Sequence, residues 1–342
     1  MTTLSKGDGR TGLANLGNTC FLNSCVQALS HTHELQAILT TEKFERALKH
    51  STDENNLIAE WNNLREVMWS QNGVVSPNRF VHHVQQLARK KDRDMFTGWA
   101  QNDLPEFLLF LIECMHNTVS RSVKMKINGK IENDTDKLAT ACYNMLKKTY
   151  SSEYSEIMEM FYGIYVSELS SISGSTIHSV NPENYFILDL EIPNKTSTLY
   201  DCFDAFTAYE TMEGENAWFN EATKAREDVR KRITFWNFPK ILVITLKRFS
   251  ADGERKRQDV VDFPLTGLNL SKYVSGYNAK QYVYDLYAVC NHTGGTMGGH
   301  YTAYVKTREG EWNHYNDTQV ERNISENKIV STKAYCMFYR KR

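Results

Sequence analysis

Closely spaced cysteine pairs are absent from this sequence. Its seven cysteines are odd in number and scattered, and no two of them have the C-x-x-C spacing that is typical of zinc sites and redox motifs. This pattern argues against a disulfide framework and against a cysteine-based zinc site. It indicates reduced thiols, so we expect a protein of the cytoplasm, the nucleus or both.

Long hydrophobic runs and an excess of one charge are also absent. No run approaches the roughly 20 apolar residues of a transmembrane helix, and the polar stretch 1–10 lacks the apolar core of a secretory signal. The formal net charge is -1 at pH 7. We therefore expect no signal peptide, no membrane association and no nucleic-acid partner, and we expect a monomer that needs no cofactor.

The chain has 342 residues, 41% of them hydrophobic, which is enough for one large domain with a substantial core. Residues from about 18 to 120 have mostly helical patterns, and helices return at about 136–160. After Phe161 the pattern becomes that of strands. The apolar run 239–249 is typical of a strand that is covered on both faces. This order predicts an α+β fold with a helical lobe followed by a mostly antiparallel β lobe.

Two helix starts and one exposed segment can be placed more closely. Ser76-Pro77 resembles a cap followed by a first-turn proline, and it predicts a helix to about Arg89. A second helix is predicted from Gln101 to Asn117. Residues 121–136 are polar and contain an Asn-Gly pair, which predicts an exposed hairpin or loop.

Cys20 stands where a loop meets a predicted helix. Two glycines and two asparagines precede it, which permits a tight loop, and residues 21–29 have one broad apolar face. A cysteine at a helix N-terminus lies near the positive end of the helix dipole, a setting that favours the thiolate. On this pattern alone, a nucleophile and a small buried cysteine in a core helix are equally good interpretations.

His300 lies where a glycine-rich loop leads into a predicted strand, and a hairpin turn follows. If the turn is Arg308-Glu309, His300 lies opposite Asp317; if it is Thr307–Glu309, His300 lies opposite Asn316. Either register places an amide or a carboxylate beside the imidazole, the arrangement that fixes the tautomer of a general base. The alternative is that these two residues merely end the strand.

Several segments together resemble the ubiquitin-specific proteases, a class of cysteine deubiquitinases. They occur in the order of that family and extend over nearly the whole chain. They are the cysteine box Gly12–Ser24, the Q-x-D segment Gln101–Leu108, the L-K-R-F strand Leu246–Phe249, the histidine box Gly298–Tyr304 with Trp312–Val320, and the last strand Ala334–Tyr339.

The resemblance implies a papain-like cysteine protease with a helical thumb, a β palm and β fingers that grip ubiquitin. Residues 1–160 would form the thumb with Cys20. Residues 161–238 would form mainly the fingers with part of the palm, and residues 239–342 the palm. All three would belong to one catalytic domain, 10–342.

The resemblance also implies the roles of five residues. Cys20 would be the nucleophile, His300 the general base and Asn316 the residue that orients it. Asp317 would assist Asn316 or substitute for it. Asn15 would donate a side-chain hydrogen bond to the oxyanion, beside the backbone N–H of Cys20.

The implied substrate is ubiquitin attached to other proteins or linked in polyubiquitin. The bond that is cut would be the isopeptide or peptide bond after the C-terminal glycine of ubiquitin. Asp103 would pair with an arginine of the ubiquitin tail, and it could cap a helix at the same time. Tyr301 and the loop 291–299 would line a channel that admits the two tail glycines and excludes larger residues.

The chain departs from the family in its fingers, where two C-x-x-C pairs often bind zinc. The corresponding regions 167–173 and 217–222 contain no cysteine, so no four-cysteine zinc site is expected and packing would hold the fingers. Leu104-Pro105 replaces the usual alanine and polar residue, which we expect to be tolerated. Alternative interpretations are a catalytically inactive ubiquitin-binding module and an enzyme for a ubiquitin-like modifier. Other thiol chemistry shares the triad but not these segments.

Overall fold

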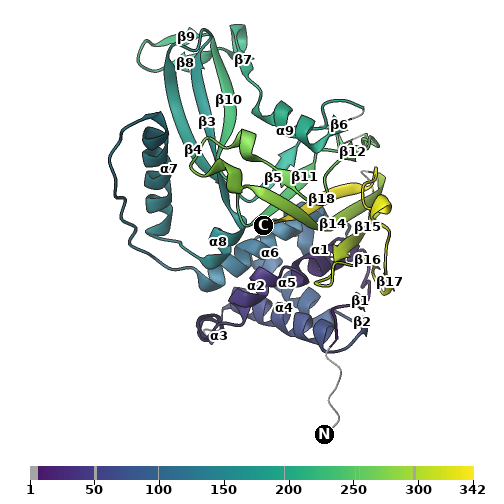
Figure 1. The fold of residues 1–342 in the computed structure, drawn as a ribbon. Helices are drawn as coiled ribbons and strands as arrows, with labels where there is room; N and C mark the ends of the chain where they lie inside the picture. The colour runs from purple at the N-terminus through teal and green to yellow at the C-terminus, as the bar shows by residue number, and fades with distance from the viewer. Residues whose placement is uncertain are drawn as a thin grey trace.

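A helical lobe and a β lobe lie side by side, with a narrow β extension rising from the β lobe (Figure 1). This arrangement confirms the α+β class. The structure, a computed structural model, describes residues 7–49, 52–98, 100–195, 197–250, 252–253, 255–295 and 298–342. None of the helices in these ranges has both the length and the apolar character that a membrane crossing needs.

Helix α1 is the centre of the helical lobe. Every residue of α1 is buried, and the helix packs against α6 and against β14 and β15 of the large sheet. The apolar face predicted at residues 21–29 thus belongs to a fully enclosed helix. The helices up to the first long strand are α1 (Cys20–Ser30), α2 (His33–Leu39), α3 (Glu42–Leu48), α4 (Asp53–Ser70), α5 (Asn78–Lys90), η1 (Asp94–Phe96), α6 (Leu104–Val119), α7 (Asp134–Tyr150) and α8 (Glu156–Phe161).

Two helices begin later than predicted, for reasons that lie in their caps. Helix α5 starts after Pro77, and no side chain caps it. Helix α6 starts at Leu104 because Asp103 adopts an extended conformation and its side chain accepts the backbone N–H of Glu106. The start of α5 differs by one residue, which is within the usual spread of a helix boundary, whereas α6 starts three residues late because Asp103 is its N-cap.

The β lobe is built on an eight-stranded sheet. All six residues of β11 are buried, which confirms the strand predicted to be covered on both faces. Its odd-numbered residues Ile241 and Val243 join the core shared with the helical lobe, whereas Leu242 and Ile244 join a second core on the opposite face. The strands are, in sheet order, β17 (Gln319–Glu321), β16 (Trp312–Asn316), β15 (Gly298–Lys306), β14 (Val283–Gly295), β18 (Ala334–Lys341), β11 (Ile241–Leu246) and β5 (Ile187–Leu190), with β13 (Leu268–Asn269) beside β14.

Smaller elements cover the second face of this sheet. Helix α9 contributes Leu199, Cys202 and Phe203 to the core there. A two-stranded parallel ladder precedes the helix and connects it to a later part of the chain. These elements are β6 (Ser197–Thr198), α9 (Leu199–Thr207), β12 (Val261–Asp262), η3 (Ser271–Tyr273), η4 (Ala279–Gln281) and η5 (Glu326–Lys328).

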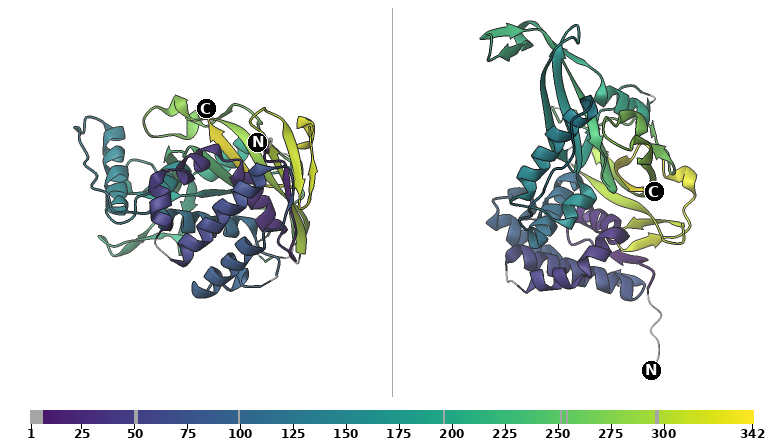
Figure 2. Two further views of the ribbon diagram at one scale, coloured as in Figure 1. Left: turned by 90° about the horizontal axis from the view of Figure 1, so that it is seen from below. Right: turned by 60° about the vertical axis from the view of Figure 1, so that its left-hand side comes forward.

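A four-stranded antiparallel sheet forms the β extension (Figure 2, right). Helix α7 packs on it: Ala139 and Cys142 share a small core with Ile164, Val166 and Trp236. The predicted thumb, fingers and palm boundaries remain a prediction. The strands are β4 (Ile177–Tyr185), β3 (Gly163–Ser171), β10 (Val229–Asn237) and β7 (Glu210–Met212), with η2 (Gly214–Asn216) and the hairpin β8 (Trp218–Asn220) and β9 (Ala225–Glu227) at the tip.

Aromatic and ionic contacts link the strands where zinc cysteines would be expected. The rings of His178 and Trp218 lie 5.1 Å apart, and the Arg232 guanidinium is 3.0 Å from the Glu168 carboxylate. Among the described residues, no group of three or more His, Cys, Asp or Glu side chains could hold a metal ion. Fingers that need no zinc remain a prediction for experiment.

A short parallel ladder brings the chain to the active-site loop. Strand β1 (Thr11–Leu13) pairs with β2 (Gly73–Val75), and it also lies against the end of the large sheet at β17. Gly12 is needed there, because a Cβ at this position would run into the backbone carbonyl of Thr318. The loop that follows is therefore fixed on both lobes.

Candidate active site

Cys20 is the first residue of α1, and its side chain is almost fully buried, with 3% of the residue exposed. The loop before it is closed by Asn15, whose side-chain oxygen accepts the N–H groups of Gly17 and Thr19, each at 3.1 Å. Gly17 and Asn18 have positive φ angles of 98° and 55°. These are the tight-loop conformations that the glycines and asparagines predicted.

The pKa of the Cys20 thiol is higher than that of an ordinary thiol. Burial is the largest influence on its pKa and raises it, and the Asp317 carboxylate adds to the rise. The backbone groups of Tyr301 and Phe21 act in the opposite direction. The helix N-terminus lowers the pKa of the thiol, as predicted, but desolvation raises it by more, so the net effect favours the protonated thiol.

His300 is hydrogen-bonded to Asn316 on the next strand. The distance from His300 Nε2 to Asn316 Oδ1 is 2.6 Å. In the ladder Ala303 pairs with Tyr315, so Asn316 lies diagonally across from His300 on the same face of the sheet. The bond holds one ring nitrogen and leaves Nδ1 for a second partner.

Both predicted hairpin registers are wrong. Lys306 pairs with Trp312, so the connection is longer than two or three residues. It is closed by a hydrogen bond of 2.8 Å from the Thr307 N–H to the Glu311 carbonyl, and Gly310 adopts a φ of 90° within it. The predicted contact with Asn316 forms all the same, through the diagonal position rather than through direct opposition.

Asp317 joins the cysteine loop to the hairpin. Its carboxylate accepts hydrogen bonds from Asn15 Nδ2 at 2.9 Å and from Asn23 Nδ2 at 2.8 Å, and its carbonyl accepts the N–H of Leu13. Its φ of 49° turns the chain at the end of β16. The structure thus brings Asp317 to two amides of the cysteine segment, whereas Asn316 is the residue at the imidazole of His300.

Asn15 lies on the loop before Cys20, and part of its side chain is already engaged. A primary amide has two N–H groups, and one of those of Asn15 is donated to Asp317. The residue is exposed on the loop that leads to Cys20. Its role as an oxyanion donor remains a prediction that rests on the second N–H.

Packing of α1 on β15 brings Cys20 close to the backbone beside His300. The backbone of Tyr301, the residue after His300, lies close enough to Cys20 to affect its thiol, and both residues belong to the same core. Among the hydrogen bonds of the described residues, none joins the thiol to the imidazole. The two residues are 280 positions apart in the chain, and the packing of α1 on β15 brings their backbones together.

A cleft of about 700 Å³ opens beside these residues. It is lined by side chains of both lobes and by two glycines of the loop before His300. Thr296 and Met297 of the predicted channel loop 291–299 lie outside the described residues. The side chains that line it include those of Asn18, Gln101, Asp103, Phe249, His292 and Tyr301.

Asp103 caps α6 and lines the cleft. One carboxylate oxygen accepts the N–H of Glu106 at 3.4 Å, and the other accepts the Tyr335 hydroxyl at 2.7 Å. Burial raises the pKa of the Asp103 carboxyl, while the Tyr335 hydroxyl lowers it. The predicted capping role is confirmed, and the pairing with an arginine of a substrate tail remains a prediction.

Tyr301 forms part of an aromatic wall of the cleft. Its ring centre is 4.6 Å from that of His292 and 6.2 Å from that of Tyr335. Burial raises the pKa of the Tyr301 hydroxyl and lowers that of His292 to about 4, so both groups are neutral near pH 7. Gly299 is required beside them, because a Cβ there would run into the His292 ring and the Thr293 carbonyl.

The hydrogen bonds made by Gln101 and by Lys256 beside the cleft were not predicted. The Gln101 side chain donates to the Gly299 carbonyl at 2.8 Å and accepts the Gly299 N–H at 2.5 Å, so it ties the helical lobe to the residue before His300. Lys256 Nζ donates to the His292 carbonyl at 2.6 Å. Gln101 lay in a segment used for the resemblance, but nothing in its spacing indicated this contact.

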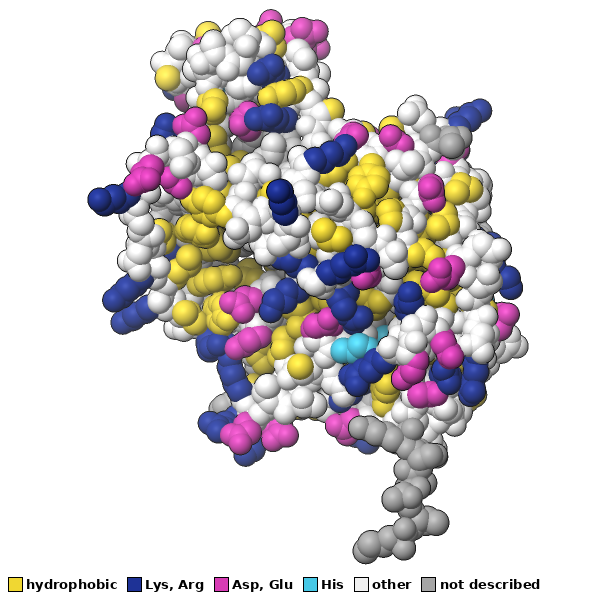
Figure 3. Space-filling model, viewed as in Figure 1, with side chains coloured by type: hydrophobic (Ala, Val, Ile, Leu, Met, Phe, Trp, Pro, Cys, Tyr) yellow, Lys and Arg dark blue, Asp and Glu magenta, His cyan; other side chains and the backbone are white. Residues whose placement is uncertain are grey.

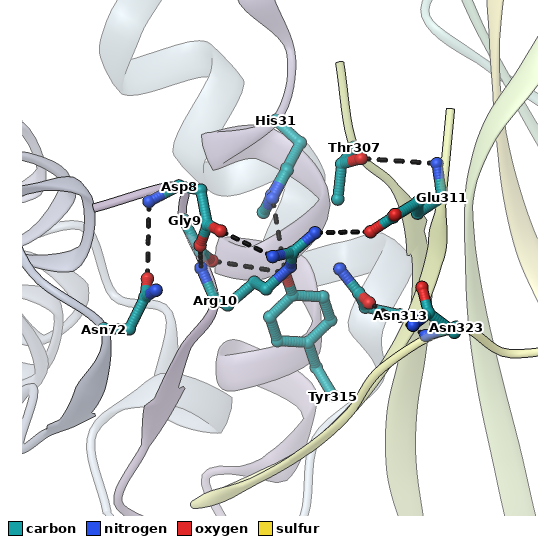
Figure 4. A network of polar contacts seen from close by, with 10 residues as sticks. All are labelled: Asp8, Gly9, Arg10, His31, Asn72, Thr307, Glu311, Asn313, Tyr315 and Asn323. Atoms are coloured by element: carbon teal, nitrogen blue, oxygen red, sulfur yellow. Dashed lines mark hydrogen bonds and ion pairs between the residues drawn. The ribbon is translucent and has the colours of Figure 1, made fainter. Parts of the chain in front are cut away.

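A polar network anchors the start of the described chain to the hairpin of His300 and Asn316 (Figure 4). The Arg10 guanidinium lies 2.6 Å from Asp8 and 2.5 Å from Glu311. The Tyr315 hydroxyl donates to the Gly9 carbonyl at 3.2 Å and lies 3.4 Å from Nε2 of the buried His31. No sequence pattern predicted this network, because its members come from segments that are far apart in the chain.

The distribution of these parts between the lobes defines the class of protein. A cysteine at the start of a core helix faces a β-sheet that carries a histidine bonded to an asparagine, which is the arrangement of the papain-like cysteine proteases. A sequence model of the family described as "Ubiquitin carboxyl-terminal hydrolase" matches residues 11–339. The chain belongs to this family.

Individual relatives agree with this assignment. The chain is 36% identical over 340 residues to bovine ubiquitin carboxyl-terminal hydrolase 2, covering 97% of this chain and 55% of the relative. It is 33% identical over 366 residues to human ubiquitin carboxyl-terminal hydrolase 21, covering 98% of this chain and 62% of that protein. The chain thus spans little more than half the length of the curated relatives it matches.

A solved structure shares the fold. The chain is similar to Ubp8 in the SAGA DUB module bound to monoubiquitin, with a TM-score of 0.76 and 23% sequence identity, over 100% of this chain and 72% of that one. This likeness shows the papain-like fold of the family's catalytic domain, as predicted.

Proposed function

We propose that the protein is a deubiquitinase that hydrolyses the bond after the C-terminal glycine of ubiquitin. The observation that carries the proposal is the hydrogen bond from His300 to Asn316 beside the buried Cys20, in a chain of the ubiquitin carboxyl-terminal hydrolase family. The same fold in a relative is bound to monoubiquitin, which supports ubiquitin as the partner. We also propose that the protein acts as a monomer in the cytoplasm, the nucleus or both.

In the proposed mechanism, Asn316 holds His300 by Nε2 so that Nδ1 is directed to Cys20. The imidazole takes the thiol proton, and the thiolate sulfur attacks the carbonyl of the terminal glycine. The N–H of Cys20 and the second amide N–H of Asn15 stabilise the oxyanion. His300 then returns the proton to the leaving lysine amine, and water hydrolyses the thioester.

The cleft between the lobes is the proposed route of the ubiquitin tail. The carboxylate of Asp103 would pair with an arginine of the tail, because a hydrogen bond between two charged groups is stronger than one between neutral groups. Tyr301 and His292 form a wall on one side of the cleft, and we propose that this wall restricts the end of the tail to glycine. Asp103→Ala should therefore raise KM for ubiquitin substrates more than it lowers kcat.

Labelling with a ubiquitin probe that carries a C-terminal electrophile tests the proposal. We expect one covalent adduct at neutral pH under reducing conditions, and peptide mapping should place it on Cys20. Cys20→Ala should abolish both labelling and turnover of a fluorogenic ubiquitin substrate while leaving the thermal unfolding curve similar. Folded protein that stays unlabelled would overturn the proposal, and a tight ubiquitin complex without turnover would favour an inactive binding module.

A further inference from the structure

The segment between α6 and α7 has the pattern of a strand without having a sheet around it. Burial alternates along residues 121–128: Val123, Met125 and Ile127 are half-buried, whereas the residues between them are exposed. This is the period of two that an extended chain shows when one face lies on the protein. The segment runs along the outer side of α7, away from β4 (Figure 1).

One edge of this segment is partly paired at its beginning. Arg121 and Tyr154 exchange backbone hydrogen bonds of 3.0 and 2.8 Å, and the Val123 N–H donates to the Tyr150 carbonyl at 2.7 Å. Backbone groups of an extended chain point alternately to its two edges. The N–H and C=O groups of Ser122, Lys124 and Lys126 therefore point to the opposite, outer edge.

The outer edge has no partner in the described chain. Throughout the ranges that the structure describes, no backbone hydrogen bond joins residues 124–131 to another segment. An open strand edge is a template on which another extended chain can pair. We call residues 122–130 with the adjoining end of α7 the lysine edge.

The lysine edge is strongly basic. Lys124, Lys126 and Lys130 are exposed, as are Lys147 and Lys148 at the end of α7, and none of the five takes part in an ion pair between described residues. Lysine and arginine side chains stand along the left margin of the molecule over this region (Figure 3).

We propose that the lysine edge binds an extended acidic segment of a partner protein by β-strand addition. Backbone groups of Lys124 and Lys126 would supply the main-chain hydrogen bonds, and carboxylates of the added strand would lie beside the lysine side chains. The charge favours an acidic partner over a second copy of this chain, because two lysine edges would repel each other.

The arrangement of the apolar side chains argues for a peptide rather than a lipid surface. Val123, Met125 and Ile127 share the half-buried face, so they are not presented for insertion into a membrane. The site also lies outside the cleft of Cys20 and His300. It would therefore capture a substrate protein or a regulator without entering the catalytic reaction, and it does not depend on that reaction.

A fluorescent peptide of alternating glutamate and valine, of about eight residues, is a direct probe. We expect it to bind the intact chain, and we expect Lys124→Glu combined with Lys126→Glu to weaken binding by about tenfold or more. Lys195→Glu combined with Lys328→Glu is the matched control: these lysines are exposed elsewhere and the change in net charge is the same. Equal weakening in both pairs, or no weakening in either, would overturn the proposal.

The backbone contribution is tested at Ser122. Ser122→Pro removes one outward N–H without altering charge, and Ser122→Ala is its control. Strand addition predicts weaker binding by the proline variant only, together with slower amide exchange at Lys124 and Lys126 when the peptide is bound. Tight binding by a proline variant that unfolds normally, or preference for phosphatidylserine vesicles over the peptide, would overturn it. Hydrolysis of a fluorogenic ubiquitin substrate should be the same in all these variants.

Discussion

Nε2 of His300 and Oδ1 of Asn316 lie 2.6 Å apart although the two residues are not opposite each other in the sheet. Their contact spans a diagonal, so it depends on the register of β15 and β16 and on the wide turn between them. The following residue, Asp317, lies on the other side of the chain and bonds to Asn15 and Asn23. The two neighbouring residues thus hold different parts of the site: Asn316 contacts His300, and Asp317 contacts the segment around Cys20.

Asn316→Ala should reduce kcat for a fluorogenic ubiquitin substrate by about 10- to 100-fold, because an unheld imidazole loses the orientation that general-base catalysis needs. The free energy of unfolding should change little, since the Asn316 side chain is only partly buried. Asn316→Asp keeps the acceptor for His300 Nε2 and should retain more activity. The interpretation fails if the alanine variant has the wild-type kcat.

Asp317→Asn should act on stability and on the thiol. Hydrogen bonds to a charged acceptor contribute about 1.5–3 kcal/mol, so loss of the carboxylate that holds Asn15 and Asn23 should lower the melting temperature. The same change removes a negative charge that raises the pKa of Cys20. Alkylation of Cys20 by iodoacetamide should therefore begin at a lower pH than in the wild-type protein.

The comparison that decides this point uses Asn316→Ala, which leaves the carboxylate of Asp317 in place. Its alkylation profile should follow that of the wild-type protein. In the wild-type protein burial raises the pKa of the thiol, so the alkylation rate should still increase with pH above the ordinary thiol pKa of about 8.5. A profile that shifts equally in both variants would show that the charge of Asp317 is not the cause.

Local patterns carried most of the fold and pointed to Cys20 and His300 as candidate site residues. The apolar run that became β11, the loop chemistry of Gly17 and Asn18, and the histidine at a strand entry each leave a signature in neighbouring residues. The acceptor beside His300 was predicted for a related reason, since a hairpin always returns to its own start. The register of the hairpin was not predicted correctly, because its turn is wider than the sequence indicated.

Contacts between distant segments could not be predicted in this way. The hydrogen bonds from Asn23 to Asp317 and from Gln101 to Gly299 join ordinary amides to partners hundreds of residues away, and no spacing rule links them. The basicity of Cys20 was missed for the same reason. Its desolvation depends on how β15 covers α1, whereas the helix dipole that the sequence indicated is a local property.

Buried histidines should make the protein less stable as the pH falls from about 6.5 to 4. Burial lowers the pKa of His31 and of His292 to about 4, so the unfolded chain binds protons that the folded protein refuses. Stability is complete above the unfolded pKa and is lost as the pH approaches the folded value, by up to about 3 kcal/mol for a fully buried group such as His31. Chemical denaturation between pH 7 and pH 5 measures this slope.

His31→Gln is the variant for this measurement, because it removes one titrating group from the network around Tyr315. Its free energy of unfolding should depend less on pH in that window, even if the substitution lowers stability at pH 7. His82, which is exposed, provides the control through His82→Gln. An unchanged slope in the first variant would contradict the assignment of the pH dependence to His31.

Gly299→Ala should damage the cleft although it adds a single methyl group. The new Cβ would run into the His292 ring and the Thr293 carbonyl, and one of these is backbone that cannot turn away. We expect a loss of about 1–3 kcal/mol in stability and a marked fall in kcat, because the displaced residue precedes His300. Gly295→Ala is the matched control in the same loop, since a Cβ there meets no atom within 4 Å. It should keep the wild-type melting temperature and kcat, and any effect should be confined to KM for ubiquitin substrates. Equal melting temperatures and equal kcat for the two variants would show that the contact with His292 does not shape the site.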